Sequence, residues 1–229
     1  MTYARSPTLA KWLSADIMSG MFHDRVEAAT RLLPKLAHVQ GDDITVLAIP
    51  RGGVVIGSVI AQQKHCPLGV VLTKKIGHPA DAEYAIGAVS LDAVQIDPGH
   101  DDVPAAYIEQ ETLRLRALLR ARQAAIAKAH ATPAIEGRTA IIVDDGIATG
   151  LTMRVAIMSV RAQHPRRIIV ATPVAAPSIP KELRPLADDV VILSTPRDFM
   201  GVGQFYRHFD QVEDDEVERL LRMAEQPRT

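Results

Sequence analysis

The chain has little cysteine and few aromatic residues: Cys66 is its one cysteine, and Phe, Trp and Tyr make up 4% of 229 residues. A single cysteine excludes an intrachain disulfide and a cysteine-based metal cluster, which suits a reducing cytoplasm. An excess of one charge is also lacking, because 26 Lys and Arg stand against 27 Asp and Glu. This balance gives no general attraction for nucleic acid or an anionic membrane, so any polyanion site must be built locally.

Long apolar runs are missing as well. No stretch approaches 18 apolar residues without a charge or a proline, and residues 1–20 lack the apolar core of a leader. We therefore expect an unexported, cytoplasmic protein with neither a membrane nor a nucleic-acid partner. The length, with 47% hydrophobic and 23% charged residues, predicts one globular domain over residues 1–229.

Short runs rich in Val and Ile alternate with helical patterns along the chain. The five runs occupy residues 44–49, 69–73, 139–143, 167–172 and 189–193. Their continuous apolarity predicts strands buried on both faces, as in a parallel sheet. Crossover helices are predicted over residues 54–64, 151–163 and 178–186. Right-handed crossovers would give a doubly wound α/β sheet, whose ligands bind beyond the carboxyl ends of the strands.

Two stretches depart from this alternation. An amphipathic helix over residues 24–36 would cover the sheet, and residues 85–137 would form an insertion. Within the insertion we expect a hairpin over 85–96 and a long helix from about Pro104 to His130. The core would then comprise residues 24–84 and 138–195, with a C-terminal hood and helix over 196–229.

The long helix carries four arginines that lie largely away from its apolar positions. They are Arg114, Arg116, Arg120 and Arg122. A solvated basic face is the simpler interpretation, and a contact with a partner or a phosphate is the alternative.

Residues 140–153, AIIVDDGIATGLTM, join a buried strand to a helix through a turn. Asp144 and Asp145 end the strand, where carboxylates suit vicinal hydroxyls and a nearby divalent cation. Free N–H groups at the helix start, with the hydroxyls of Thr149 and Thr152, would receive a terminal phosphate. This candidate phosphate turn comprises Gly146, Ile147, Ala148, Thr149, Gly150, Leu151 and Thr152. For the acid pair alone, helix capping is an equally good interpretation.

The complete order of an apolar strand, DD, ATG and T is much more specific than the acid pair. It resembles the phosphoribosyl-diphosphate signature of the type I phosphoribosyltransferases. It is not a Walker A loop, because no Gly-Lys-Ser/Thr follows. The resemblance implies a doubly wound, mainly parallel sheet with a small hood formed by the chain ends and the insertion.

Residues 49–57, IPRGGVVIG, place Arg51, Gly52 and Gly53 in a strand-to-helix turn. The glycines let the backbone approach an anion closely, and Arg51 adds a forked cation that suits two diphosphate oxygens. Alone, Gly-Gly indicates only an ordinary turn. Beside the later signature, the segment resembles the pyrophosphate loop of the family, which implies a cis peptide bond between Pro50 and Arg51.

Lys74 and Lys75 follow the second predicted strand and enter a stretch with Gly, Pro and Asp. Lysines at a strand exit are usually solvated, but this composition predicts a mobile segment that could close as a lid. Its position resembles the flexible catalytic loop of the type I family. The strings KKIG and EYAIGAV, within residues 73–89, resemble a bacterial group of phosphoribosyltransferases with no assigned substrate.

Phe199, Phe205, Tyr206 and Phe209 concentrate aromatic side chains after the last predicted strand. A satellite core under the C-terminal helix is the simpler interpretation of Phe205 and Phe209. By resemblance, Phe199 and Tyr206 would form the nucleobase pocket. The resemblance to the bacterial group continues through this segment and so covers essentially the whole chain.

The resemblance implies transfer of phosphoribose from phosphoribosyl diphosphate to a nitrogen acceptor, with release of pyrophosphate. Asp144 and Asp145 would hold the ribose hydroxyls and, largely through them, Mg²⁺. Arg51, Lys74 and Lys75 would stabilise the leaving pyrophosphate. As a strand-end carboxylate, Asp145 is expected to be exposed and to contribute to turnover rather than to stability.

Other properties follow from the resemblance less directly. A homodimer is implied by the family alone. Ala148 stands where the 6-oxopurine enzymes carry an aspartate, so a role with those bases is weakened and the acceptor stays open. A regulatory protein that binds the donor without transferring it, and a phosphohydrolase acting on a ribose phosphate, are the alternatives.

Overall fold

The computed structural model describes residues 21–100 and 102–225. Its centre is a parallel sheet with the strand order β2-β1-β6-β7-β8. The strands are β1 (Ile44–Ala48), β2 (Leu68–Val70), β6 (Thr139–Val143), β7 (Arg167–Val174) and β8 (Asp189–Ser194). Every predicted run forms a strand, although β2 ends at Val70, and the doubly wound α/β fold is confirmed.

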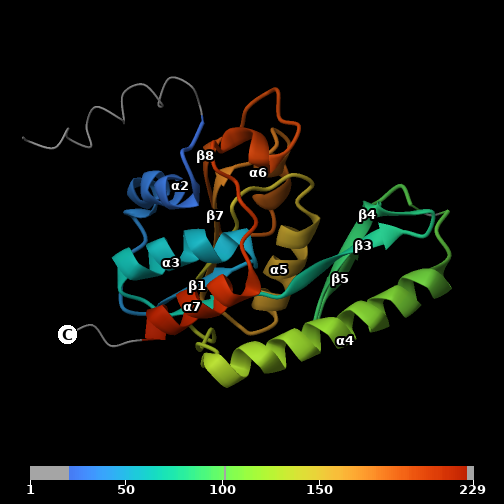
Figure 1. The fold of residues 1–229 in the computed structure, drawn as a ribbon, viewed down its shortest axis with the longest axis horizontal. Coiled ribbons are helices and arrows are strands. Elements are labelled where there is room, and N and C mark those ends of the chain that lie inside the picture. Colours follow the sequence, from blue (N-terminus) through green and yellow to red (C-terminus); the bar gives the residue numbers. More distant parts are fainter. Residues whose placement is uncertain (1–20, 101, 226–229) are drawn as a thin grey trace, which may run out of the picture.

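Helices cover both faces of this sheet (Figure 1). One face carries α2 (Arg25–Leu32), α3 (Gly52–Lys64) and α7 (Asp214–Glu225), and the other carries α5 (Leu151–Arg161) and α6 (Ile179–Leu183). Alternate strand residues face the two layers: Ile141 packs in the layer of α3, and Ile142 packs in the layer of α5. Burial on both faces explains why the strand sequences are continuously apolar.

The predicted N-terminal helix is confirmed in two parts. α2 begins after Asp24, whose carboxylate accepts a hydrogen bond of 2.8 Å from the amide of Glu27. The chain then tightens into the 3-10 helix η1 (Leu33–Leu36), where Pro34 has no amide hydrogen to continue the α-helical pattern.

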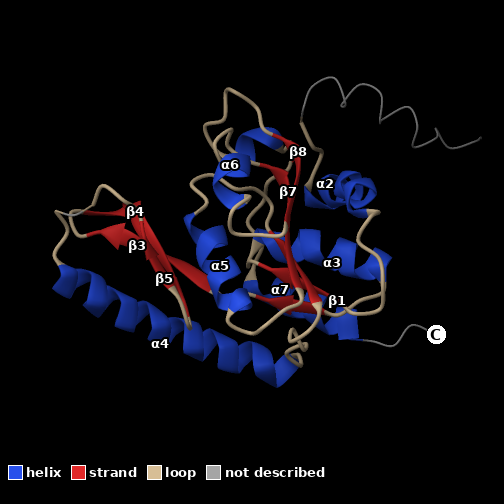
Figure 2. Cartoon of the chain, turned by 180° about the vertical axis from the view of Figure 1, so that it is seen from behind, coloured by secondary structure: helices blue, strands red, loops and turns tan. Residues whose placement is uncertain are grey.

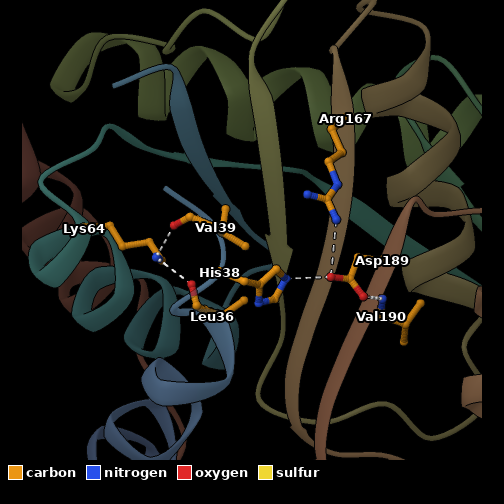
Figure 3. Close-up of polar contacts among 7 residues, drawn as sticks. All are labelled: Leu36, His38, Val39, Lys64, Arg167, Asp189 and Val190. Atoms are coloured by element: carbon orange, nitrogen blue, oxygen red, sulfur yellow. Dashed lines mark hydrogen bonds and ion pairs between the residues drawn. The ribbon is translucent and has the colours of Figure 1, made fainter. Parts of the chain in front are cut away.

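Polar contacts fix the end of η1 to the amino ends of the strands (Figure 3). Lys64, at the end of α3, donates to the carbonyl oxygens of Leu36 and Val39 at 2.9 and 2.7 Å. His38 contacts Asp189 at the start of β8, with 2.8 Å between Nε2 and Oδ2. These contacts cover the amino ends of the strands, opposite the edge where ligands are expected.

A second sheet and a long helix project from the core, and we call them the arm (Figure 2). The antiparallel sheet has the order β3-β4-β5, with β3 (Thr73–His78), β4 (Asp81–Ser90) and β5 (Val94–Ile96), and the helix is α4 (Ala105–Ala129). The long helix is therefore confirmed. The hairpin, predicted over 85–96, already begins at Thr73.

The arm sheet is packed between two helices. Ile76 and Val89 are buried with Leu115 and Leu119 of α4, while Ala88 packs in a cluster with residues of α5. The prediction of an irregular loop at Lys74 and Lys75 is therefore wrong, because both lysines belong to β3, which pairs with β4.

No helix within residues 21–100 and 102–225 is both long and apolar enough to cross a membrane. Cys66 follows α3 and is half-buried. Burial raises the pKa of its thiol to about 11.

Candidate active site

The site lies beyond the carboxyl ends of β1 and β6, where the strand order changes direction. From β1 the chain passes through α3 to β2, and from β6 it passes through α5 to β7, on the opposite face. The two connections diverge and leave a crevice between them. A cavity of about 610 Å³ opens there, a size that suits a small ligand.

The cavity brings together most of the predicted site residues. Those in its lining are Arg51, Gly52, Lys74, Lys75, Asp144, Asp145, Gly146, Ala148, Thr149, Gly150 and Thr152. The other predicted residues, Gly53, Ile147 and Leu151, are buried and are not part of this lining. The cations and the acid pair therefore share one space, although three different stretches of sequence supply them.

Asp145 is held by Arg25 of α2. The guanidinium Nε donates to Oδ2 of Asp145 at 2.8 Å, and the two side chains are only 11% and 14% exposed. Arg25 also donates to the carbonyl oxygen of Asp210 at 2.8 Å and lies 4.0 Å from the centre of the Phe209 ring. The expectation of an exposed Asp145 is wrong, because α2 and the C-terminal segment close over this strand end.

Ionisation of the acid pair is electrostatically unfavourable in the free protein. Burial, together with the neighbouring Asp145, raises the pKa of Asp144 well above its usual value. Burial also raises the pKa of Asp145, and the Arg25 guanidinium opposes this rise. Hydroxyl donors or a cation brought by a ligand would relieve the cost of ionising Asp144.

Gly52 has a role beyond the predicted approach to an anion. A Cβ at this position would lie 1.8 Å from Oδ2 of Asp145 and 2.9 Å from Nε of Arg25. The missing side chain therefore makes room for the buried ion pair. Gly53 lies against β6, where a Cβ would come within 2.8 Å of the Val143 carbonyl oxygen. The peptide bond between Pro50 and Arg51 is cis, as the resemblance implied.

The phosphate turn is anchored to the end of β7. The amide of Ile147 donates to the Val174 carbonyl at 3.0 Å, and the Ile147 carbonyl accepts from Ala176 at 2.9 Å. Gly150 has φ 75°, a left-handed conformation that favours glycine, and it makes no side-chain cap for α5. The first amides of α5 have no acceptor within the helix, so the turn keeps donors for an anion beside the exposed Thr149.

The two residues predicted for the base pocket lie outside the cavity lining. Tyr206 is 5% exposed, and its hydroxyl donates to the carbonyl oxygen of Asp145 at 2.6 Å. Phe199 stacks on Phe205 with 5.5 Å between ring centres. Tyr206 therefore contacts the strand end, Phe199 packs on the core ring Phe205, and neither is part of the cavity lining.

Val202, in the 3-10 helix η2 (Val202–Phe205), contributes an apolar side chain of the C-terminal segment to the cavity lining. A Cβ on Gly146 would lie 2.4 Å from Cγ1 of Val202, so the glycine permits this close approach. Phe205 is buried in the core, as the simpler interpretation predicted.

Of two further charged residues in the cavity, sequence reasoning missed Asp214 and left Arg122 open between a solvated face and a contact with a partner or a phosphate. Arg122 of α4 and Asp214 of α7 both line it, and NH2 of Arg122 lies 2.5 Å from Oδ1 of Asp214. The spacing of Arg122 favours the contact, because this residue follows the buried Leu119 by three residues and precedes Ile126 by four. An arginine in the apolar stripe of a helix indicates a specific partner.

The chain is similar to known proteins over most of its length. Residues 21–208 match a family model described as "Phosphoribosyl transferase domain". Two Mycobacterium tuberculosis proteins, from strains CDC 1551 / Oshkosh and ATCC 25618 / H37Rv, are each 36% identical over 210 residues. Their names are "Putative phosphoribosyl transferase MT0597" and "Putative phosphoribosyl transferase Rv0571c". The chain belongs to the phosphoribosyl transferase family.

The matched region is about half of the mycobacterial proteins and nearly all of a protein from Thermus thermophilus. It covers 89% of this chain and 47% of each mycobacterial protein, so the chain spans about half the length of the curated relatives it matches. The crystal structure of TT1426 from Thermus thermophilus is 38% identical with a TM-score of 0.76. That comparison covers 89% of this chain and 98% of TT1426.

Proposed function

We propose that the chain transfers phosphoribose from phosphoribosyl diphosphate to a nitrogen acceptor, a nucleobase or related heterocycle, and releases pyrophosphate. The cavity is the observation that carries this proposal. It holds an anion-binding turn, a carboxylate pair and a group of cations. The donor carries a terminal phosphate, ribose hydroxyls and a diphosphate, which match these three groups.

The cavity residues would act mainly by electrostatic stabilisation. The acceptor nitrogen supplies the electron pair of the new bond to the anomeric carbon, and the pair of the broken C–O bond leaves with pyrophosphate. Arg51, Lys74 and Lys75 would stabilise the charge that grows on the leaving group. Asp144 and Asp145 would accept hydrogen bonds from the ribose hydroxyls and stabilise positive charge on the sugar.

Mg²⁺ fits the chemistry of this site. Asp144 and Asp145 offer hard oxygen donors, and a cation would offset the cost of their burial. Across residues 21–100 and 102–225 no group of three or more His, Cys, Asp or Glu could hold a metal by itself. The ion would therefore be held largely through the donor, where it would neutralise charge on the leaving pyrophosphate.

The acceptor would lie between the hood and the phosphate turn. Val202 is the apolar side chain of the C-terminal segment in the cavity lining, and the exposed Ala148 of the turn lines the same cavity. These residues would form the acceptor face, supported from behind by Phe199 and Tyr206. A small residue at 148 leaves space, without a carboxylate, next to the acceptor.

Assembly and location are further parts of the proposal. A homodimer in the cytoplasm is expected from the family resemblance. Light scattering should give twice the chain mass of 24.9 kDa at micromolar concentration, and a monomer would contradict this part.

The proposal is tested by pyrophosphate release from phosphoribosyl diphosphate and Mg²⁺ with a panel of bases. Release that depends on both the donor and one base is expected. Replacing Thr149 and Thr152 together with valine should weaken donor binding in calorimetry, whereas Thr132→Val, an exposed threonine outside the cavity, should not. Donor binding without turnover would favour a regulatory role, and phosphate release without a base would favour a hydrolase.

A further inference from the structure

Two arginines of the cavity are paired with acids at the start of α7. NH2 of Arg122 lies 2.5 Å from Oδ1 of Asp214, and NH1 of Arg51 lies 3.6 Å from Oε2 of Glu213. The arginines come from different units, because Arg51 precedes α3 in the core and Arg122 belongs to α4 in the arm. The start of α7 therefore contacts one cation of the core and one of the arm.

The two members of each pair differ in their access to water. The arginine side chains are 33% and 29% exposed, and the acids are 66% and 67% exposed. An ion pair with a well-hydrated partner contributes little to stability. The guanidinium groups are held in the cavity wall, and their present partners are weak enough to be exchanged.

A diphosphate is a stronger partner for these arginines than a single carboxylate. It carries several negative oxygens, and a forked guanidinium can bind two of them at once. The α7 carboxylates offer one charge each at the same guanidinium groups.

We propose that Arg122 is a donor-binding residue supplied by the arm, and that Glu213 and Asp214 occupy Arg51 and Arg122 until the donor displaces them. The proposal rests on the proposed function. It adds Arg122 to the donor-binding cations and makes the two α7 acids competitors of the donor. Donor binding breaks both ion pairs and separates the start of α7 from the arm.

A purely structural role for these pairs makes the opposite prediction. If Asp214 only holds α7 over the site, its loss loosens the cavity and weakens donor binding. If Asp214 competes with the donor, its loss strengthens donor binding. The sign of the change therefore decides between the two roles.

The decisive variant is Asp214→Asn, studied by titration calorimetry with Mg²⁺ and phosphoribosyl diphosphate, and separately with inorganic pyrophosphate. We expect binding that is about two- to fivefold tighter, the range of an exposed ion pair. Asp215→Asn is the matched control, since Asp215 is exposed in the same turn and lies outside the lining. An affinity equal to or weaker than that of the control would overturn the proposal.

Arg122→Gln tests the cation itself. Loss of a charge-assisted contact should weaken donor and pyrophosphate binding about tenfold. Arg120→Gln, an exposed arginine of α4 outside the lining, should bind like the unmodified protein. In the Arg122→Gln background the gain from Asp214→Asn should disappear. Unchanged binding by Arg122→Gln would also overturn the proposal.

Failure of the proposed function gives a different result. A protein that binds pyrophosphate but not phosphoribosyl diphosphate contradicts the transferase, and the pyrophosphate titrations then decide the role of Arg122. Binding of neither compound overturns both proposals. Thermal melting of each variant separates a lost contact from a lost fold, and the exposed Asp214 provides a readout even if Arg122→Gln is unstable.

Discussion

The central sheet and the arm both contribute residues to the cavity, but from different kinds of structural element. The sheet is buried on both faces and delivers its residues from strand ends and turns, Arg51 and the Asp144–Asp145 pair among them. The arm delivers Lys74 and Lys75 from a strand and Arg122 from a helix. Site residues of the central sheet follow strands that form the core, whereas those of the arm belong to elements that project from the core.

This difference predicts different consequences of mutation. Changes at the sheet edge should affect stability and donor binding together, because the same groups pack and bind. Changes of arm cations should affect binding alone. The following variants test this contrast.

The largest effect is expected for Arg25→Met. Asp145 would remain mostly buried without its cation, and we expect a loss of about 2–4 kcal/mol of unfolding free energy at neutral pH, somewhat less than for a fully buried pair. Urea denaturation checks the value. The double variant Arg25→Met with Asp145→Asn should recover most of the loss. Arg31→Met, which removes a pair at 3.8 Å on the same helix, is the control and should cost clearly less.

Gly52→Ala should come next. The added Cβ would overlap the Asp145 carboxylate, so we expect about 1–3 kcal/mol of destabilisation and loss of donor binding. Gly201→Ala is the control, because its backbone is extended and no atom lies within 4 Å of the added Cβ. Equal stability and donor affinity for the two variants would show that the space at Gly52 is not needed.

Asp144→Asn should be more stable than the unmodified protein at neutral pH and less active. The folded-state pKa of Asp144 is raised, so the folded protein binds the proton more tightly and ionisation opposes folding. Stability is therefore lost as the pH rises from the usual range of aspartate through the raised pKa. Each unit of rise corresponds to about 1.4 kcal/mol. Denaturation measured across this pH range should show the extra stability of Asp144→Asn only at the high-pH end. A variant less stable than the unmodified protein at neutral pH would contradict the raised pKa.

The smallest effects are expected in the arm. Lys74→Gln and Lys75→Gln should each lower donor affinity about three- to tenfold, around 1 kcal/mol, and leave the melting temperature unchanged because both side chains are exposed. Lys128→Gln is the control, an exposed lysine of α4 outside the cavity lining. A marked loss of stability in either variant would remove the contrast between arm and sheet.

The same contrast explains what the sequence could predict. Strands buried on both faces are continuous runs of Val and Ile, so β1, β6, β7 and β8 were found nearly to the residue. The acid pair and the turn follow β6 directly, so local sequence was enough to place these residues at the carboxyl edge of the sheet. The cis bond at Pro50 came from the resemblance alone.

The missed features depend on contacts between distant segments. Arg25 meets Asp145 across 120 positions of sequence, so no local pattern indicated that this carboxylate is covered. In β3 the one fully buried side chain is Ile76, with exposed lysines before it and Gly77 after it, a composition typical of a loop. Only the packing of α4 and α5 around the arm sheet makes this segment a strand.

The raised pKa of the Cys66 thiol allows a label to be attached selectively to the arm. The thiolate is the reactive form of cysteine, and with its pKa raised to about 11 the native thiol is protonated at neutral pH and reacts slowly with maleimides. A second cysteine at an exposed arm position, for example Glu83→Cys, would be labelled first. A fluorophore or spin label can thus be attached there with Cys66 left in place, and its environment followed as donor is added.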